Sequence, residues 1–171
     1  TIWQGKGEQK ISIAGIYLPQ DTYYLLVNNK YGHFSMENPY TLNLIMEAQK
    51  RYGEREPNDD KENANGFLWS QGSLHLGPGY IAPPKDKDYY QIDIQGQRRQ
   101  RFRFSVTAAP EQKLQISITD PQGYILKKAV KNPHQKLSFA ETIDGKAYII
   151  VELLDGRMSI QNPYFIKLSP K

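Results

Sequence analysis

The side chains with the clearest chemistry in this sequence carry oxygen ligands and gather in two short stretches. The first stretch lies within residues 54–59, and the second, at residues 86 and 88, follows a Pro-rich segment. The set consists of Glu54, Glu56, Asn58, Asp59, Asp86 and Asp88. Ca²⁺ takes about six to eight hard oxygen ligands. A fold that joins the two stretches would form a calcium site that orders the acidic residues; the alternative is a charged, solvated linker without a metal.

Other residues could form a ligand-binding surface. Arginine and phenylalanine alternate over residues 101–104, a pattern that surfaces for single-stranded nucleic acids also show. On a β-strand, Arg101 and Arg103 would face one side and the phenylalanines the other. We therefore expect core phenylalanines, solvated arginines and no nucleic-acid partner, with an anionic polymer or acidic protein surface as the alternative partner of the arginines. Tyr80 and Tyr89 are candidates for an aromatic surface, since tyrosine has an apolar body and a polar tip.

Composition and motifs argue against an enzyme and against a membrane helix. The chain has no Cys, which excludes disulfides, thiolate metal sites and a Cys nucleophile. It lacks a Gly-x-Ser-x-Gly elbow, a His-Glu-x-x-His motif, a P-loop and a dinucleotide fingerprint. No apolar run approaches the roughly 20 residues of a membrane-spanning helix. The net charge of +4 is modest and permits, without requiring, attraction to acidic surfaces.

The chain contains an internal repeat. Residues 23–44 align without a gap with residues 147–168. The identical positions, named in the first copy, are Tyr24, Val27, Gly32, Ser35, Asn38, Pro39, Tyr40 and Leu44. Because this match includes the turn residues as well as the strands, it indicates a duplication. We therefore divide the chain into the closing part of a preceding repeat (1–47), a linker (48–55) and a complete unit (56–171), and we expect the first part to dock on the complete unit or to pair with strands of another chain.

Apolar and polar residues alternate with period two over most of the chain, which is typical of half-buried β-strands. The alternating segments are 11–13, 23–27, 40–44, 90–94, 102–106, 114–118, 137–139, 148–151 and 164–168. With turn residues between them, they predict an all-β, antiparallel sandwich. Residues 77–85 contain two Gly and three Pro and are expected to form a long loop.

The order of several short motifs resembles that of the bacterial pre-peptidase C-terminal domain, which is similar to the collagen-binding domains of clostridial collagenases. The motifs lie at residues 54–59 (EREPND), 86–92 (DKDYYQI), 114–123 (LQISITDPQG), 144–151 (DGKAYIIV) and 162–164 (NPY). The resemblance covers about residues 54–168. In the collagen-binding relatives, a Glu-x-Glu-x-Asn-Asp spacing is associated with calcium held between linker and sandwich, and residues 54–59 match that spacing. The Pro-rich loop before Asp86 is longer than the family usually carries.

The resemblance implies a jelly-roll-like β-sandwich that has no catalytic residues and is appended to exported bacterial proteins. We therefore expect a non-catalytic accessory module, secreted, at the cell surface or in the periplasm, with calcium as its cofactor. Its expected partner is an extracellular polymer or a neighbouring domain of a longer protein. The alternative is a structural repeat unit of a cell-surface or filament assembly, in which copies of the chain exchange strands.

Overall fold

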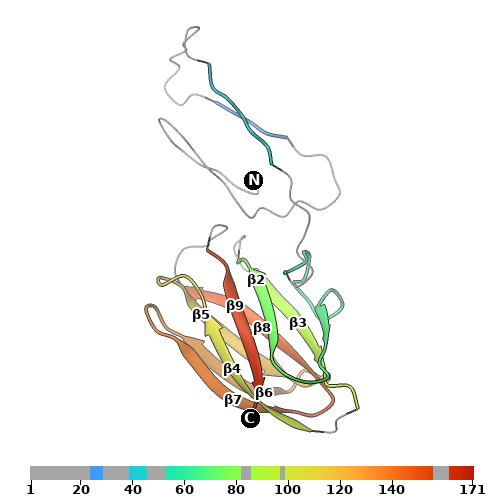
Figure 1. Ribbon diagram of the computed structural model, residues 1–171. Helices are drawn as coiled ribbons and strands as arrows, with labels where there is room; N and C mark the ends of the chain where they lie inside the picture. The colour runs from blue at the N-terminus through green and yellow to red at the C-terminus, as the bar shows by residue number, and fades with distance from the viewer. Residues whose placement is uncertain (1–23, 29–38, 46–52, 82–85, 97–98, 156–161) are drawn as a thin grey trace.

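The computed structural model describes residues 24–28, 39–45, 53–81, 86–96, 99–155 and 162–171, which contain nine β-strands and no helix (Figure 1). The strands are β1 (Asn65–Leu68), β2 (Leu74–Gly79), β3 (Lys87–Asp93), β4 (Gln100–Thr107), β5 (Lys113–Thr119), β6 (Ile125–Lys131), β7 (Leu137–Ile143), β8 (Lys146–Asp155) and β9 (Tyr164–Pro170). No described segment is a helix of the length and apolarity needed to cross a membrane.

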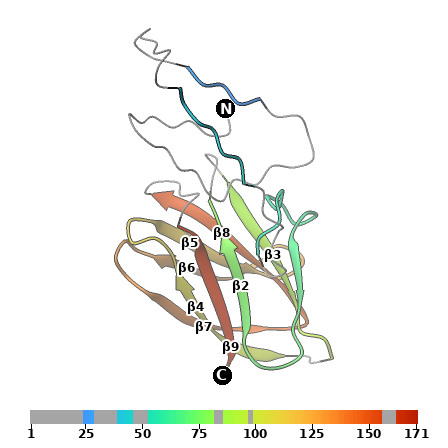
Figure 2. The same ribbon diagram turned by 45° about the horizontal axis from the view of Figure 1, so that its top comes forward.

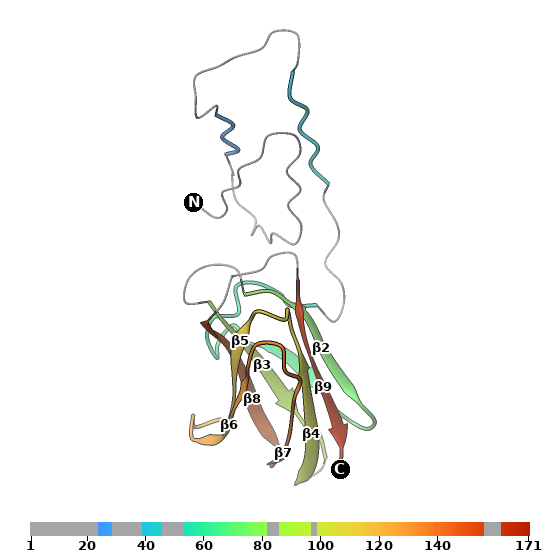
Figure 3. The ribbon, with the colours of Figure 1, turned by 90° about the vertical axis from the view of Figure 1, so that its left-hand side faces the viewer.

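The strands form two layers, a five-stranded sheet of order β1-β3-β8-β5-β6 and a four-stranded sheet of order β2-β9-β4-β7 (Figure 3). The eight strands β2 to β9 form a jelly roll. The first and the last of these eight strands, β2 and β9, are neighbours in the four-stranded sheet. The prediction of an all-β sandwich is confirmed. One pair departs from the antiparallel prediction, because β1 runs parallel to β3, from Asn65 beside Tyr90 to Leu68 beside Asp93. The chain reverses twice between them, through β2 in the other sheet.

The core fills the space between the two sheets. It is lined by alternate residues of the inner strands, as the period-two pattern predicts. Phe104 stacks on Phe139, with ring centroids 5.0 Å apart, and Trp69 meets Phe102 edge-on at 4.9 Å. Among the fully buried side chains are Leu76, Tyr90, Ile92, Phe102, Phe104, Leu114, Ile116, Ile118, Ile149, Val151, Tyr164, Ile166 and Leu168.

The structure adds three strands, β1, β2 and β6, that the sequence pattern does not predict. Strand β2 continues to Gly79, so the expected loop at residues 77–85 is wrong at its start. Its pairing with β9 shifts register between Leu76 and Gly79, around Pro78. Because β2 is an edge strand, Pro78 needs no amide donor toward a second neighbour. Strand β6 is also an edge strand, and its side chains are exposed on both faces over most of its length, so it shows no alternation.

The described parts of the N-terminal segment are residues 24–28 and 39–45. All of these residues are exposed and none belongs to a strand, so the strands expected at 23–27 and 40–44 are not formed by the residues described there. A strand needs a neighbouring strand to satisfy its backbone groups, which local alternation alone cannot supply. The other predictions for residues 1–23, 29–38 and 46–52 lie outside the described residues. The partial second copy therefore stays a prediction.

Candidate metal centre

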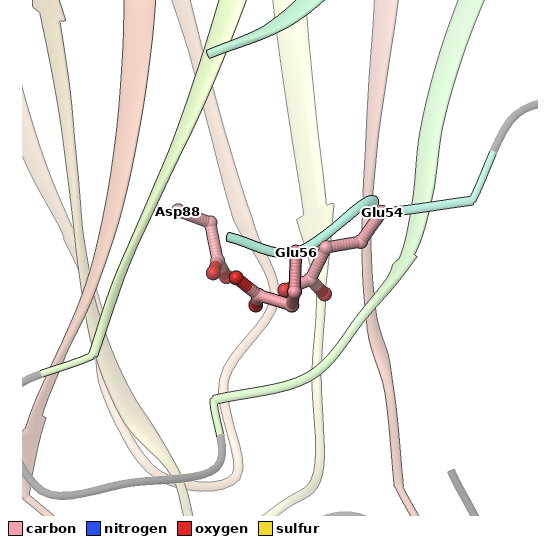
Figure 4. Close-up of side chains that lie close together, drawn as sticks. All are labelled: Glu54, Glu56 and Asp88. Carbon is pink, nitrogen blue, oxygen red and sulfur yellow. The ribbon is translucent and has the colours of Figure 1, made fainter. Parts of the chain in front are cut away.

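Five of the six predicted ligand residues come together in two overlapping groups of three carboxylates. One group contains Glu54, Glu56 and Asp88 (Figure 4), and the other contains Glu56, Asp59 and Asp86. In each group, one oxygen from every member lies within 4.8 Å of the others. Because Glu56 belongs to both groups, it lies at the centre of the cluster. We call these five residues the acidic cluster.

Backbone hydrogen bonds fix the acidic stretch onto the sandwich. The Glu54 amide donates to the carbonyl of Pro78 in β2 (3.1 Å), and the Asn58 carbonyl accepts from the amide of Tyr89 in β3 (2.9 Å). The side chain of Asn65 in β1 bonds both backbone groups of Arg55, at 2.9 and 3.0 Å. Three strands therefore hold the backbone of this stretch against the sandwich, while the side chains of Arg55 and Asp59 stay exposed.

Asn58 lies inside the cluster, but its amide is oriented as a donor. The hydrogen-bond network assigns its Oδ1 as acceptor from Asn65 Nδ2 (2.8 Å), because Asn65 is itself fixed by the Arg55 backbone. The Asn58 Nδ2 then donates to Glu56 Oε2 (3.1 Å) and Asp88 Oδ1 (3.3 Å). Asn58 is fully buried. In this orientation it positions two carboxylates and offers no side-chain oxygen to a cation.

Two tyrosines that sequence analysis did not connect with the site support Asp88 from the core. The Tyr164 hydroxyl donates to Asp88 Oδ2, and Tyr90 and Tyr164 share a hydrogen bond of 2.7 Å between their hydroxyl oxygens. Since Tyr164 gives its single proton to Asp88, the Tyr90 hydroxyl is the donor in the second bond. All three residues are buried. The alternation of apolar and polar residues placed both tyrosines in the core. A buried tyrosine hydroxyl requires a hydrogen-bond partner, and this requirement could have indicated that the two tyrosines bond a polar group of the site.

The end of β2 closes the site on another side. The Tyr80 amide donates to Glu54 Oε2, so Tyr80 belongs to the surroundings of the acidic cluster and is half-buried there. Gly79 lies directly against the Tyr164 ring, because a Cβ at this position would be 2.3 Å from the Tyr164 Cζ atom. A side chain at position 79 would displace the ring that supports Asp88. The glycine is therefore required by close approach.

Burial and mutual repulsion raise the pKa of two carboxyl groups of the cluster, those of Glu54 and Asp88. Burial is the largest cause that raises the pKa of Glu54, followed by its hydrogen bond with Glu56 and the charge of Asp88. Burial and the charge of Asp86 raise the pKa of Asp88 well above its usual range, although the Tyr164 hydroxyl acts in the opposite direction. Burial likewise raises the pKa of Tyr164, so its hydroxyl stays protonated as a donor. The ionised forms of Glu54 and Asp88 are therefore disfavoured in the folded protein unless a cation joins them.

The donor set fits a hard cation. Five carboxylates provide enough oxygens for the coordination of Ca²⁺, and a divalent charge would favour their ionised forms. Within the described residues, no Lys or Arg forms a salt bridge with Glu56, Asp59 or Asp88. A metal could therefore supply the positive charge that these three side chains lack.

The other predicted ligand-surface residues lie elsewhere. Tyr89 is half-buried in β3, opposite Ile150 of the five-stranded sheet. Arg101 and Arg103 are exposed on the outer face of the four-stranded sheet. The fold thus places the Tyr89 side chain on the opposite face of β3 from Asp88 and the two arginines in the other sheet, so the candidates do not form one site.

Comparison with known proteins finds similarity only among solved structures. No protein-family model and no curated protein matches the chain. The pre-peptidase C-terminal domain of a collagenase from Bacillus anthracis, solved at 1.0 Å, is 17% identical, with a TM-score of 0.43, over 63% of this chain and 94% of that one. A structure described as "CBM4 structure and function" is 12% identical (TM-score 0.33) over 58% of this chain and 71% of that one. The GH26-CBM35 β-(1,4)-mannanase of Podospora anserina is 12% identical (TM-score 0.35) over 59% of this chain and 28% of that one.

Proposed function

We propose that this chain is a non-catalytic accessory module of an exported bacterial protein, that it binds an extracellular polymer, and that it holds calcium at the acidic cluster. The position of the cluster carries the proposal. Glu54 and Glu56 come from the stretch that enters the sandwich, whereas Asp86 and Asp88 come from the start of β3. A cation bound by both the entering stretch and the start of β3 would fix the direction in which the chain enters the module. Such a fixed entry suits a module that holds a neighbouring domain close to a polymer.

Cosedimentation with insoluble polymers tests the proposal. The full chain is incubated with cellulose, chitin, collagen fibrils and calcium pectate, and the bound fraction is measured after washing. We expect retention on at least one polymer, without release of reducing sugars or new amino termini. With the three polymers that do not themselves contain calcium, the measurement is repeated in chelator, which should lower any retention that needs the ordered acidic stretch. If no polymer retains the chain in either condition, the proposed function is wrong.

A second candidate function is a structural repeat that exchanges strands between copies of the chain. The observation that favours it is a set of exposed apolar residues at repeat positions whose counterparts form the core. The exposed residues Leu25, Val27, Tyr40, Leu42 and Leu44 correspond to Ile149, Val151, Tyr164, Ile166 and Leu168, all fully buried or nearly so. The exposed fractions of Tyr40 and Leu44 are 75% and 81%. Large apolar side chains exposed in this number are typical of a surface that another chain covers.

Solution mass as a function of concentration tests this second candidate. We expect the full chain to sediment as a dimer or larger assembly, and the double substitution Leu42→Ser with Leu44→Ser to shift it toward monomer. Leu68→Ser is the matched control, since Leu68 is an exposed leucine of β1 in the complete sandwich. A wild-type chain that stays monomeric at every concentration would exclude strand exchange between copies.

A further inference from the structure

The outer face of the four-stranded sheet carries a line of basic side chains. Arg101 and Arg103 of β4 point away from the core, since the phenylalanines between and after them are fully buried. Lys167 of β9 lies opposite Ser105 in β4, and His75 of β2 lies opposite Lys167. All four side chains are exposed. We call these four residues the cationic face; their strands are adjacent in Figure 2.

No acidic side chain occupies a described outer position of this face. Of the outer positions of β2, β9, β4 and β7, none is Asp or Glu, and many are small and polar, such as Ser105, Ser138 and Thr142. The two salt bridges of the described chain both join β3 to β8 in the other sheet, one between Lys87 and Glu152 (3.2 Å) and one between Lys146 and Asp93 (3.4 Å). The charges of the five-stranded sheet are therefore partly paired, whereas those of Arg101, Arg103 and Lys167 face solvent.

The spacing of the cations suits a linear polyanion. Alternate residues of one strand lie about 7 Å apart, and diagonal neighbours on adjacent strands lie about 7–8 Å apart. Arg101, Arg103 and Lys167 thus form a row with similar steps across β4 and β9. We propose that this row binds an acidic polysaccharide, whose carboxylate or sulfate groups pair with the cations while its hydroxyl groups bond the small polar residues between them. The inference rests on the proposed function and names the class of polymer and the face that takes it.

The composition of the face favours a polysaccharide over the other polyanions. Proteins that bind single-stranded nucleic acids present several aromatic side chains for base stacking. Among the described outer positions of this sheet, Phe165 is the one exposed phenylalanine, two residues before Lys167 in β9. A protein partner would require an apolar centre to its interface, whereas the outer residues between the basic side chains are serine, threonine and alanine, with Phe165 at the end of the row. Hydroxyl-rich, charged sugars match both the cations and the polar floor.

Affinity electrophoresis of the full chain tests the proposal, with polygalacturonate and heparin in the gel as acidic probes and dextran as the neutral probe. The double variant Arg101→Gln with Arg103→Gln removes two cations of the row. Lys127→Gln with Lys128→Gln is the matched control, because it removes equal charge from exposed positions of β6 in the other sheet. We expect both acidic probes to retard the wild type in a salt-sensitive manner. The arginine variant should bind the acidic probes about tenfold more weakly, because it loses two charge-assisted contacts. The control variant should bind as the wild type does.

Three results would overturn the inference: no retardation by either acidic polysaccharide, equal loss in both double variants, or displacement of polygalacturonate by a single-stranded oligodeoxynucleotide at equal charge. Retention on a neutral polymer with none on the acidic probes would leave the proposed function standing while this inference fails. Since the substituted arginines are exposed, thermal unfolding of the variants should match the wild type, which separates loss of binding from loss of fold.

Discussion

Calcium is expected to raise the melting temperature of this protein by roughly 5–10 °C at a hundredfold excess over its dissociation constant. A ligand that binds only the folded state at that excess adds about 2.7 kcal/mol to the free energy of unfolding, and each kcal/mol moves the midpoint of a protein of this size by about 2–4 °C. The acidic cluster supplies the ligands, and Glu56 is common to both of its carboxylate groups. Differential scanning fluorimetry with calcium and with chelator measures the shift.

Substitution separates this effect from general charge screening. Glu56→Gln should remove most of the calcium-dependent shift, because it takes one ligand from each group. Glu62→Gln is the matched control, since Glu62 is exposed and outside the cluster yet only six positions along the chain. It should keep the full shift. A wild-type protein that melts at the same temperature with calcium and with chelator would show that the cluster holds no calcium.

Without a cation, the free energy of unfolding should fall as the pH rises from about 5 to about 8. Burial raises the pKa of Glu54 and of Asp88 in the folded state, whereas an unfolded carboxyl group titrates near pH 4. Above that pH the folded protein binds more protons at these groups than the unfolded chain does. The contribution of these two groups to the free energy of unfolding is therefore fully present below about pH 4 and is lost as the pH rises toward their folded pKa values. Calcium should cancel this loss, since it favours the ionised carboxylates.

The variant Glu54→Gln isolates the contribution of one group. Glutamine resembles the protonated acid and can still accept the Tyr80 amide. In chelator, the variant should match the wild type near pH 5 and exceed its free energy of unfolding near pH 8, as measured by urea unfolding. If the free energies of unfolding of the variant and the wild type differ by the same amount at every pH in this range, the pKa of Glu54 is not raised. The same variant should respond less to calcium.

Alternation alone was enough to identify the strands that are buried on one face. In β4 and β9, every second residue enters the core, so Phe102 and Tyr164 could be placed there from their spacing, and Arg101 and Arg103 on the outside. The acidic stretches were equally visible, because ligand chemistry depends on residue type. Strand β6 was missed because an edge strand with two exposed faces has no period. Strand β2 was missed because its Gly and Pro residues are tolerated at an edge.

Tertiary structure decided which of these residues meet. The amino-acid sequence determined that acidic residues are concentrated before β1 and at the start of β3, but pairing of distant strands brought Glu56 beside both Asp86 and Asp88. Register, which depends on the packing of whole sheets, placed Lys167 diagonally from Arg103 and so formed a cationic row from separate strands. Tyr164 reaches Asp88 across the core only because Gly79 leaves room for its ring. Local alternation determines toward which face of a strand a side chain points. Its contacts depend on the pairing of strands that are distant in the sequence, and this pairing cannot be deduced from spacing along the chain.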